Sequence, residues 1–191
     1  MELQILKWVD ATFHSVDWLN QIMKYITYLG EFGAAAIITA VVLLAVKSTR
    51  KAGVAAAIAL VLNVLIVNVI LKTAVNRARP WTEFSELQTF YESCGVRLPT
   101  DSSFPSGHTA ACVCIAVVLV IRFKLNGLPA LAIALFVGLS RIYLCVHYPT
   151  DVLGGLIIGA ACGVAGHFLG RLVCDKWEKY RSKKSPPDNT E

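Results

Sequence analysis

Two histidines stand where they could do chemistry in this 191-residue sequence, and the more telling of the two is His147. Asp151 lies four residues further on, close enough in a turn or a first helical turn to accept an imidazole N–H and fix the tautomer. The other ring nitrogen is then left as a nucleophile. The pair therefore predicts a nucleophilic histidine with an orienting carboxylate, although the same spacing also occurs in a helix-capping pair.

The second histidine, His108, follows a segment whose residue types predict an anion site. Pro105 ends the preceding element, Ser106 is a favourable N-cap, and the apolar run 110–121 after them is long enough for a membrane helix. The first free backbone N–H groups of that helix, including that of Gly107, then point toward the Ser106 hydroxyl, with the positive end of the helix dipole behind them. Phosphate binds readily at such places, whereas an isolated helix start of this kind is more often only a cap.

Three cations are placed to meet a phosphate near these histidines. Lys72 and Arg79 are seven residues apart, so both would project from one face of a helix that continued past the membrane. Pro80 then disfavours helix at Arg79 and turns the chain. Arg141 comes near the end of an apolar run, where an arginine either snorkels or forms a fork to phosphate. We expect these cations to converge with both histidines. Attack on phosphorus requires fixed positive charge nearby, which neutralises the charge on the equatorial oxygens.

The composition is that of an integral membrane protein. Hydrophobic residues make up 55% of the chain, charged residues make up 16%, and the mean hydropathy is +0.58, which is too apolar for a soluble domain. The formal net charge of +5 is distributed by loop and not as a basic stripe with interleaved aromatic residues, so nucleic acid is not the expected partner. The six cysteines show neither a disulfide framework nor the spacing of a zinc site.

The elements that must position these residues are predicted to be membrane helices. Residues 3–28 are amphipathic and carry two tryptophans, which predicts a helix lying in the membrane interface. The expected fold is all-α: an integral membrane helical bundle of five to six transmembrane helices with this N-terminal amphipathic interfacial helix. We expect one membrane-embedded domain over 1–174 and a charged cytoplasmic tail over 175–191, disordered in its last dozen or so residues. The apolar runs that predict spans lie at 32–46, 52–71, 109–121, 127–146 and 152–169.

Small and polar residues inside these runs predict how the helices pack. Gly155, Gly159 and Gly163 recur at a spacing of four, which lets a neighbouring helix approach closely. Asn63 and Asn68 are expected to form interhelical hydrogen bonds.

Basic residues predict the orientation. If five spans alternate, the lysines and arginines of the loops gather mainly on one side, which the positive-inside rule makes cytoplasmic. The segments 72–108 and 147–151, which hold the candidate site, then lie on the extracytoplasmic side. The positive-inside rule does not account for cations on that side, and a bound anion explains them. The connector 76–104 carries several aromatic residues and is expected to cover the site in part, either as an interfacial aromatic belt or as a substrate gate.

Three segments together resemble the signature of the type 2 phosphatidic acid phosphatase (PAP2) superfamily, in order and in internal spacing: Lys72-x6-Arg79-Pro80, Pro105-Ser106-Gly107-His108, and Ser140-Arg141-x5-His147-x3-Asp151. The resemblance covers about residues 50–170 and implies a helical bundle with a metal-independent site that uses no cofactor. It implies that His147 is the nucleophile and forms a phosphohistidine, that Asp151 orients it, and that His108 is the acid for the leaving group. Many relatives have a complete first transmembrane span, whereas residues 3–28 of this chain are expected to lie in the membrane interface. The phosphate cradle implied by the resemblance consists of Lys72, Arg79, Ser106, the Gly107 N–H and Arg141.

The expected function is that of an extracytoplasmic hydrolase, embedded in the lipid bilayer, that removes a terminal phosphate from a membrane lipid. Similar small bacterial members recycle undecaprenyl diphosphate to the monophosphate, and this substrate is the first expectation. Hydrolysis of phosphatidylglycerophosphate or phosphatidate is the alternative within the class. From another class, a non-catalytic lipid carrier or scaffold could use the same cradle only to hold a headgroup. The sequence leaves the identity of the lipid and the oligomeric state open.

Overall fold

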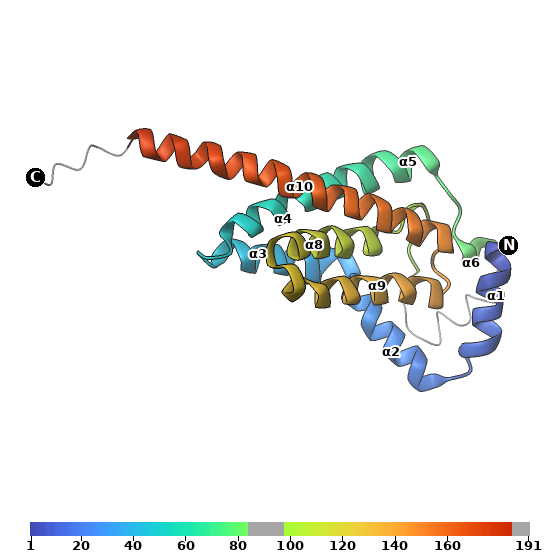
Figure 1. Cartoon of the computed structure of the whole chain (residues 1–191). Coiled ribbons are helices and arrows are strands. Elements are labelled where there is room, and N and C mark those ends of the chain that lie inside the picture. Colours follow the sequence, from blue (N-terminus) through green and yellow to red (C-terminus); the bar gives the residue numbers. More distant parts are fainter. Residues whose placement is uncertain (84–97, 185–191) are drawn as a thin grey trace, which may run out of the picture.

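The structure of the protein is a computed structural model that describes residues 1–83 and 98–184 (Figure 1). This described part is helical and contains no β-strand, so the all-α fold class is confirmed. The connector 76–104 was expected to cover part of the site, but most of its aromatic residues fall at 84–97, outside the described residues.

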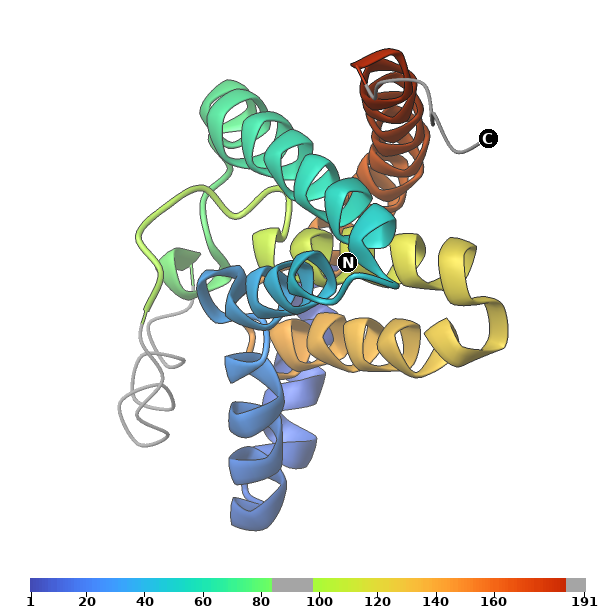
Figure 2. The same cartoon turned by 90° about the vertical axis from the view of Figure 1, so that its left-hand side faces the viewer.

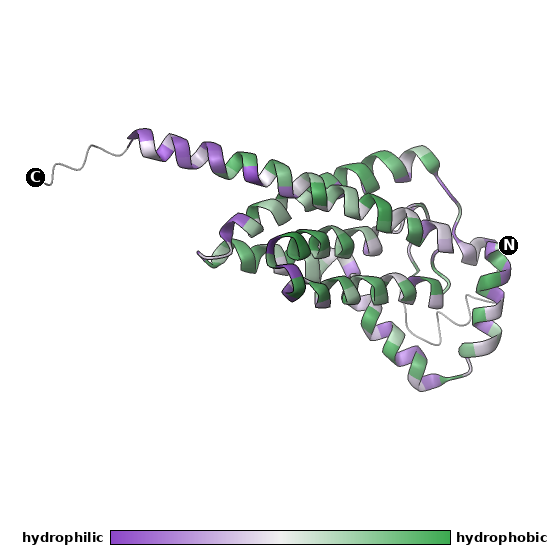
Figure 3. Cartoon of the chain, in the orientation of Figure 1, coloured by the Kyte–Doolittle hydropathy of each residue, from purple (hydrophilic) through white to green (hydrophobic). Residues whose placement is uncertain are grey.

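The centre of the molecule is a bundle of apolar helices. Helix α8 (Gly107–Phe123) packs against α4 (Arg50–Asn63), α9 (Leu128–Tyr143) and α10 (Pro149–Lys184), and α3 (Ala34–Ala45) lies beside α4 (Figures 1 and 2). Hydrophobic residues run along the whole bundle, whereas hydrophilic residues gather at the far end of α10 (Figure 3).

Three stretches of the described chain contain helices that are long and apolar enough to cross a membrane, by length and composition: Arg50–Glu83, Gly107–Tyr143 and Pro149–Lys184. The second of them contains both α8 and α9, which are joined by the 3-10 turn η3 (Lys124–Gly127) and pack against each other (Figure 2). The chain is therefore a multi-pass membrane protein.

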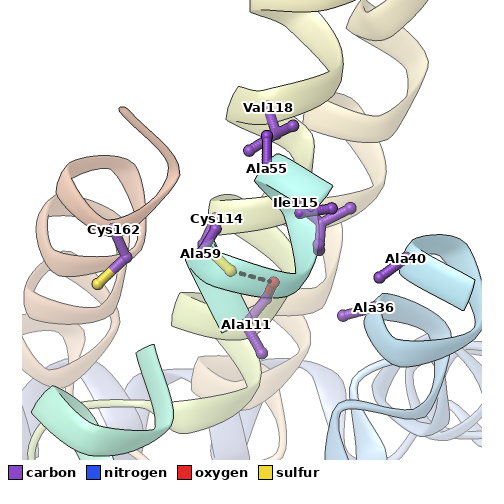
Figure 4. Close-up of a cluster of buried hydrophobic side chains, with 10 residues drawn as sticks. Ala36, Ala40, Ala55, Ala59, Ala111, Cys114, Ile115, Val118 and Cys162 are labelled. Atoms are coloured by element: carbon purple, nitrogen blue, oxygen red, sulfur yellow. Dashed lines mark hydrogen bonds between the residues drawn. The ribbon is translucent and has the colours of Figure 1, made fainter. Parts of the chain in front are cut away.

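Small residues allow the bundle to pack tightly. The buried cluster in Figure 4 joins Ala36 and Ala40 of α3 and Ala55 and Ala59 of α4 to Cys114 of α8. Because alanine side chains are short, the helix backbones approach closely and dispersion contacts accumulate along the interfaces.

Gly155, Gly159 and Gly163 of α10 face α8, as their spacing predicts. A Cβ atom on Gly159 would stand 2.5 Å from the carbonyl oxygen of Ala110, and one on Gly155 would stand 2.7 Å from that of Ser106. The backbone N–H of Ser106 also donates to the carbonyl oxygen of Asp151 at 3.0 Å. This close approach fixes the start of α8 against the start of α10, where the candidate site residues lie.

The N-terminal segment forms two helices where a single helix was expected over 3–28. They are α1 (Glu2–Phe13) and α2 (Asp17–Tyr28), with a corner at His14. The Nε2 atom of His14 lies 2.7 Å from the carbonyl oxygen of Tyr143, and the amide of Asn20 donates to the carbonyl oxygen of His14 at 2.8 Å. These bonds hold the corner against the end of α9. The interfacial location of both helices stays a prediction.

Helix α10 extends beyond the apolar run expected at 152–169. The expected disorder of the last dozen or so residues is wrong for 180–184, which are helical, and 185–191 lie outside the described residues. Arginine, lysine, leucine and glutamate make up most of 171–184, and neither glycine nor proline occurs there, so the helix continues after the apolar stretch ends.

Candidate active site

The predicted site residues lie at one end of the bundle, where the end of α5 (Lys72–Val75), the segment 98–106 and the starts of α8 and α10 meet. Contacts across this end join segments that are distant in the sequence. Arg79 lies against His147, Lys72 pairs with Asp101, and Lys72 also lies beside Gly107 at the start of α8.

His147 and Asp151 are both buried, with side-chain exposures of 1% and 0%. The imidazole Nδ1 lies 3.6 Å from Oδ2 of Asp151, slightly beyond hydrogen-bond length. The same Oδ2 accepts a hydrogen bond from the Ser103 hydroxyl at 2.5 Å and one from the Tyr148 backbone N–H at 2.9 Å. The carboxylate is therefore held facing Nδ1, and Nε2 of His147 faces Arg79, whose Nη1 lies 3.4 Å away.

Burial lowers the pKa of His147 to about 3, because the charged imidazolium is poorly stabilised away from water. The charges of Arg141 and Arg79 act in the same direction, and the nearby Asp151 opposes them. The imidazole is therefore neutral at neutral pH, and a neutral imidazole has the free lone pair that a nucleophile requires.

Asp101, a residue that was not predicted from the sequence, links two of the predicted phosphate-binding cations. Its Oδ1 accepts a hydrogen bond from Nη2 of Arg79 at 2.6 Å, and its Oδ2 pairs with the Lys72 ammonium. Partial burial opposes ionisation of this carboxyl, but the hydrogen bonds and charges of Lys72 and Arg79 outweigh it and lower the pKa of Asp101 to about 2. An ionised carboxylate thus occupies the position between the cations that suits a phosphate oxygen.

The seven-residue spacing of Lys72 and Arg79 does not place them on one helical face. The helix ends at Val75, and Asn76 adopts the left-handed conformation with φ 44°, so Arg79 lies in the following loop. Arg79 is anchored there by the carbonyl oxygens of Asp101 at 2.7 Å and Val146 at 2.9 Å. The two cations meet through Asp101 and not through a shared helix.

The start of α8 differs in one detail from the expected anion site. Ser106 is the N-cap residue, but its hydroxyl makes no capping bond and accepts a hydrogen bond from the Thr109 hydroxyl at 2.9 Å. Gly107 opens the helix beside Lys72 and Asn68, because a Cβ atom on Gly107 would lie 3.6 Å from the lysine Nζ and 3.7 Å from the asparagine Oδ1.

Arg141 is positioned by Thr27, a residue whose role was not predicted from the sequence. Its side chain is 4% exposed, and Nη1 donates to the hydroxyl of Thr27 at 2.5 Å. Helix α2 therefore contributes to the site through Thr27, and the turn after it contributes Gly30, which lies against the ring of His108.

A cavity of about 540 Å³ extends from the cations into the bundle. Lys72, His108 and Arg141 line it together with apolar residues such as Leu60 and Val64. Leu60 and Lys72 lie twelve residues apart on one continuous helical segment, so the cavity runs along that segment. Its lining suits a molecule with an anionic head and an apolar chain.

The interhelical hydrogen bond expected of Asn63 is not formed within the described residues. Its side chain is buried, it lines the cavity, and its Oδ1 has no hydrogen-bond partner in that part of the chain. Asn68 lines the same cavity one turn nearer the cations, and the π-helical turns of η2 (Val64–Leu71) lie between Asn63 and Lys72.

The family model and the relatives that match this chain agree on one family. Residues 52–171 match the family described as the PAP2 superfamily. The undecaprenyl-diphosphatase BcrC of Bacillus subtilis (strain 168) is 30% identical over 167 residues, which cover 85% of this chain and 81% of that protein. Phosphatidylglycerophosphatase B of the same organism is 31% identical over 179 residues, which cover 87% of this chain and 80% of that protein.

Two solved structures share the fold. One is the first transmembrane PAP2 type phosphatidylglycerolphosphate phosphatase from Bacillus subtilis, with a TM-score of 0.66 and 26% identity, covering 92% of this chain and 85% of that chain. The other is Aquifex aeolicus LpxE, with a TM-score of 0.66 and 26% identity, covering 86% of this chain and 93% of that chain.

Proposed function

The chain belongs to the PAP2 superfamily of membrane lipid phosphatases, and from this premise we propose that it converts undecaprenyl diphosphate to undecaprenyl phosphate through a phosphohistidine. The observation that carries the proposal is the neutral, buried His147, whose Nδ1 faces the Asp151 carboxylate and whose Nε2 faces the cations. The relative named undecaprenyl-diphosphatase supports the choice of substrate.

In the proposed first step, Nε2 of His147 forms a bond to the terminal phosphorus while the P–O bond to the lipid-side phosphate breaks. His108, which lines the same cavity as Lys72 and Arg141, gives a proton to the departing oxygen. In the second step, water attacks the phosphohistidine and gives a proton to His108, which releases inorganic phosphate and restores His147. No step needs a metal, because cations of the chain neutralise the phosphoryl oxygens.

The proposed phosphate cradle consists of Lys72, Arg79, Arg141, the Gly107 N–H and Ser106. In this proposal the substrate displaces the Asp101 carboxylate from the cations, since a phosphate oxygen carries the same charge and makes the same kinds of hydrogen bond. The lipid chain lies in the cavity along Val64 and Leu60. The site faces the extracytoplasmic side, as the distribution of basic loop residues predicts.

Phosphatidylglycerophosphate is the second candidate substrate. The relative named phosphatidylglycerophosphatase B and the phosphatidylglycerolphosphate phosphatase structure favour it. Asn63 favours it too, because a glycerol-based lipid offers hydroxyl and ester groups to an unpartnered amide, whereas a polyprenyl chain offers none.

Phosphate release by the purified protein in detergent, with a chelator present, tests the proposal. We expect kcat/KM to be at least about tenfold higher for a polyprenyl diphosphate than for phosphatidylglycerophosphate or phosphatidate. The His147→Ala variant should lose activity by about a thousandfold or more. Equal release by both proteins would reject the assigned nucleophile, and lipid binding without release by the wild type would favour a carrier. A higher kcat/KM for phosphatidylglycerophosphate would select the second candidate.

A further inference from the structure

Only one oxygen of the Asp151 carboxylate faces His147. The other oxygen, Oδ1, accepts a hydrogen bond from Nη1 of Arg77 at 2.6 Å, and the same guanidinium nitrogen donates to the hydroxyl of Thr150 at 2.7 Å. The Asp151 side chain is 0% exposed and that of Arg77 is 28% exposed, so the ion pair lies at the edge of the buried site. Arg77 is not among the residues of the PAP2 signature found in the sequence.

The guanidinium of Arg77 is held on three sides. Its Nη2 donates to Oε2 of Glu2 at 2.6 Å, and its Cζ lies 4.0 Å from the centre of the Tyr148 ring. Its backbone is fixed as well, because its N–H donates to the Ser102 hydroxyl at 3.0 Å. A guanidinium that is bound by two carboxylates and stacked on an aromatic ring has little rotational freedom.

Glu2 in turn is anchored to the start of α10. Its Oε1 accepts hydrogen bonds from the backbone N–H of Thr150 at 3.0 Å and from the Thr150 hydroxyl at 2.6 Å. Helix α1 therefore lies at the same end of the bundle as the start of α10 (Figure 1). A continuous series of contacts runs from Glu2 through Arg77 and Asp151 to the imidazole of His147.

We propose that Arg77 and Glu2 are positioning residues for the nucleophile, which makes helix α1 part of the active site. Arg77 fixes Oδ1 of Asp151, so that Oδ2 remains directed at Nδ1 of His147. Glu2 fixes the orientation of Arg77. This inference rests on the proposed function, in which Asp151 keeps Nε2 of His147 available for attack. The competing explanation is that Arg77 and Glu2 only attach α1 to the bundle.

Steady-state kinetics on a polyprenyl diphosphate in detergent separate these explanations. Arg77→Gln should lower kcat by about tenfold to a hundredfold, because a charge-assisted hydrogen bond to a buried carboxylate is lost, while KM stays within about twofold. Arg77→Lys should recover part of this loss, since lysine keeps the charge but cannot contact both carboxylates through one planar group. Added guanidinium should partly restore kcat in Arg77→Ala, and sodium chloride at equal ionic strength should not.

Matched controls are available at the opposite end of α10. Arg171→Gln and Glu178→Gln remove the same side-chain charges there and should leave kcat unchanged. The melting temperature of each variant in the same detergent shows whether it is folded. An unchanged kcat in folded Arg77→Gln, or a rise in KM that accounts for the whole loss of activity, would overturn the inference. If the Arg77 variants do not fold, Glu2→Gln decides it: we expect kcat to fall about threefold, and an unchanged kcat would overturn the inference.

A spectroscopic readout keeps this test separate from the proposed function. In ¹⁵N spectra of histidine-labelled protein without substrate, the wild type should show a His147 resonance with the proton on Nδ1, identified by its loss in His147→Gln. Arg77→Gln should shift that resonance toward a mixture of tautomers, and Arg171→Gln should not. An unshifted resonance in Arg77→Gln contradicts the positioning role. If the wild type shows the resonance with the proton on Nδ1 and Arg77→Gln shifts it, but the wild type hydrolyses no lipid phosphate, only the proposed function is contradicted.

Discussion

Gly30 and the imidazole of His108 lie in direct contact, and a Cβ atom on Gly30 would stand 2.9 Å from Cδ2 of the ring. The same Cβ would stand 2.9 Å from Cγ1 of Val137, so it has no room to move away from the ring. Gly30→Ala should therefore displace the proposed general acid and lower kcat by about tenfold to a hundredfold. The measurement is kcat on a polyprenyl diphosphate in detergent.

Gly53→Ala is the control for steric crowding away from the site. A Cβ atom on Gly53 would stand 2.5 Å from the backbone nitrogen of Leu44, between α3 and α4. This variant should lower the melting temperature, whereas the kcat of its folded fraction should match the wild type. A Gly30→Ala enzyme with unchanged kcat would show that the His108 ring tolerates the shift.

Asp101→Asn should lower KM by about fivefold at most. The Asp101 carboxylate competes with the substrate phosphate for Lys72 and Arg79, and the side chain is 49% exposed, so solvent limits its pairing to about 1 kcal/mol. Because the pKa of Asp101 is lowered to about 2, this competition should persist at every pH at which activity can be measured. The matched control, Asp175→Asn near the far end of α10, should leave KM unchanged. A rise in KM would show that Asp101 orients the cations and does not compete with phosphate.

Val64→Trp should raise KM for a long-chain lipid phosphate while leaving a short-chain phosphate unaffected. Val64 lines the cavity, and an indole there would fill the space proposed for the lipid chain. The adjacent Leu65 does not line the cavity, although the two residues are 47% and 48% exposed. Leu65→Trp is therefore a closely matched control. Equal KM values for the two variants on the long-chain substrate would place the chain elsewhere.

His147→Gln should make the fold less sensitive to mild acid. Burial lowers the pKa of His147 to about 3 from 6.5, so below pH 6.5 the unfolded chain binds a proton there that the folded chain does not. The contribution of His147 to the free energy of unfolding is fully present above pH 6.5, falls as the pH drops toward about 3, and stays constant below that. Between about pH 7.5 and about pH 5, the wild type should lose up to about 2 kcal/mol more stability than the variant.

Thermal unfolding in detergent at both pH values measures this difference. His14, His108 and His167 are present in both proteins, so the comparison isolates position 147. Equal losses of stability in the two proteins would mean that His147 is protonated as readily in the folded chain as in water.

The sequence predicted the parts of the site that depend on local spacing. His147 and Asp151 face each other because four residues bring them together across one turn, and Gly155 and Gly159 meet α8 because their spacing repeats along one helical face. The all-α membrane fold followed from the length and hydropathy of the apolar runs in the same way.

The contacts that depend on packing between distant segments could not be predicted. Thr27 meets Arg141, and Glu2 meets Arg77, only after the N-terminal helices have folded back onto the bundle. The expected helical alignment of Lys72 and Arg79 was wrong because Asn76 leaves the helix in the left-handed conformation, which asparagine adopts only occasionally.

Helix α10 has 36 residues and is therefore about 54 Å long, whereas the hydrocarbon core of a bilayer is about 30 Å thick. Its first turn carries Asp151, so its last turns reach well past the opposite surface of the bundle (Figure 1). A cysteine introduced at the exposed Ser182, in a variant whose six native cysteines are replaced, would thus react with a membrane-impermeant thiol reagent only from the compartment that the phosphate site does not face. One labelling reaction on intact cells would reveal the sidedness of the entire enzyme.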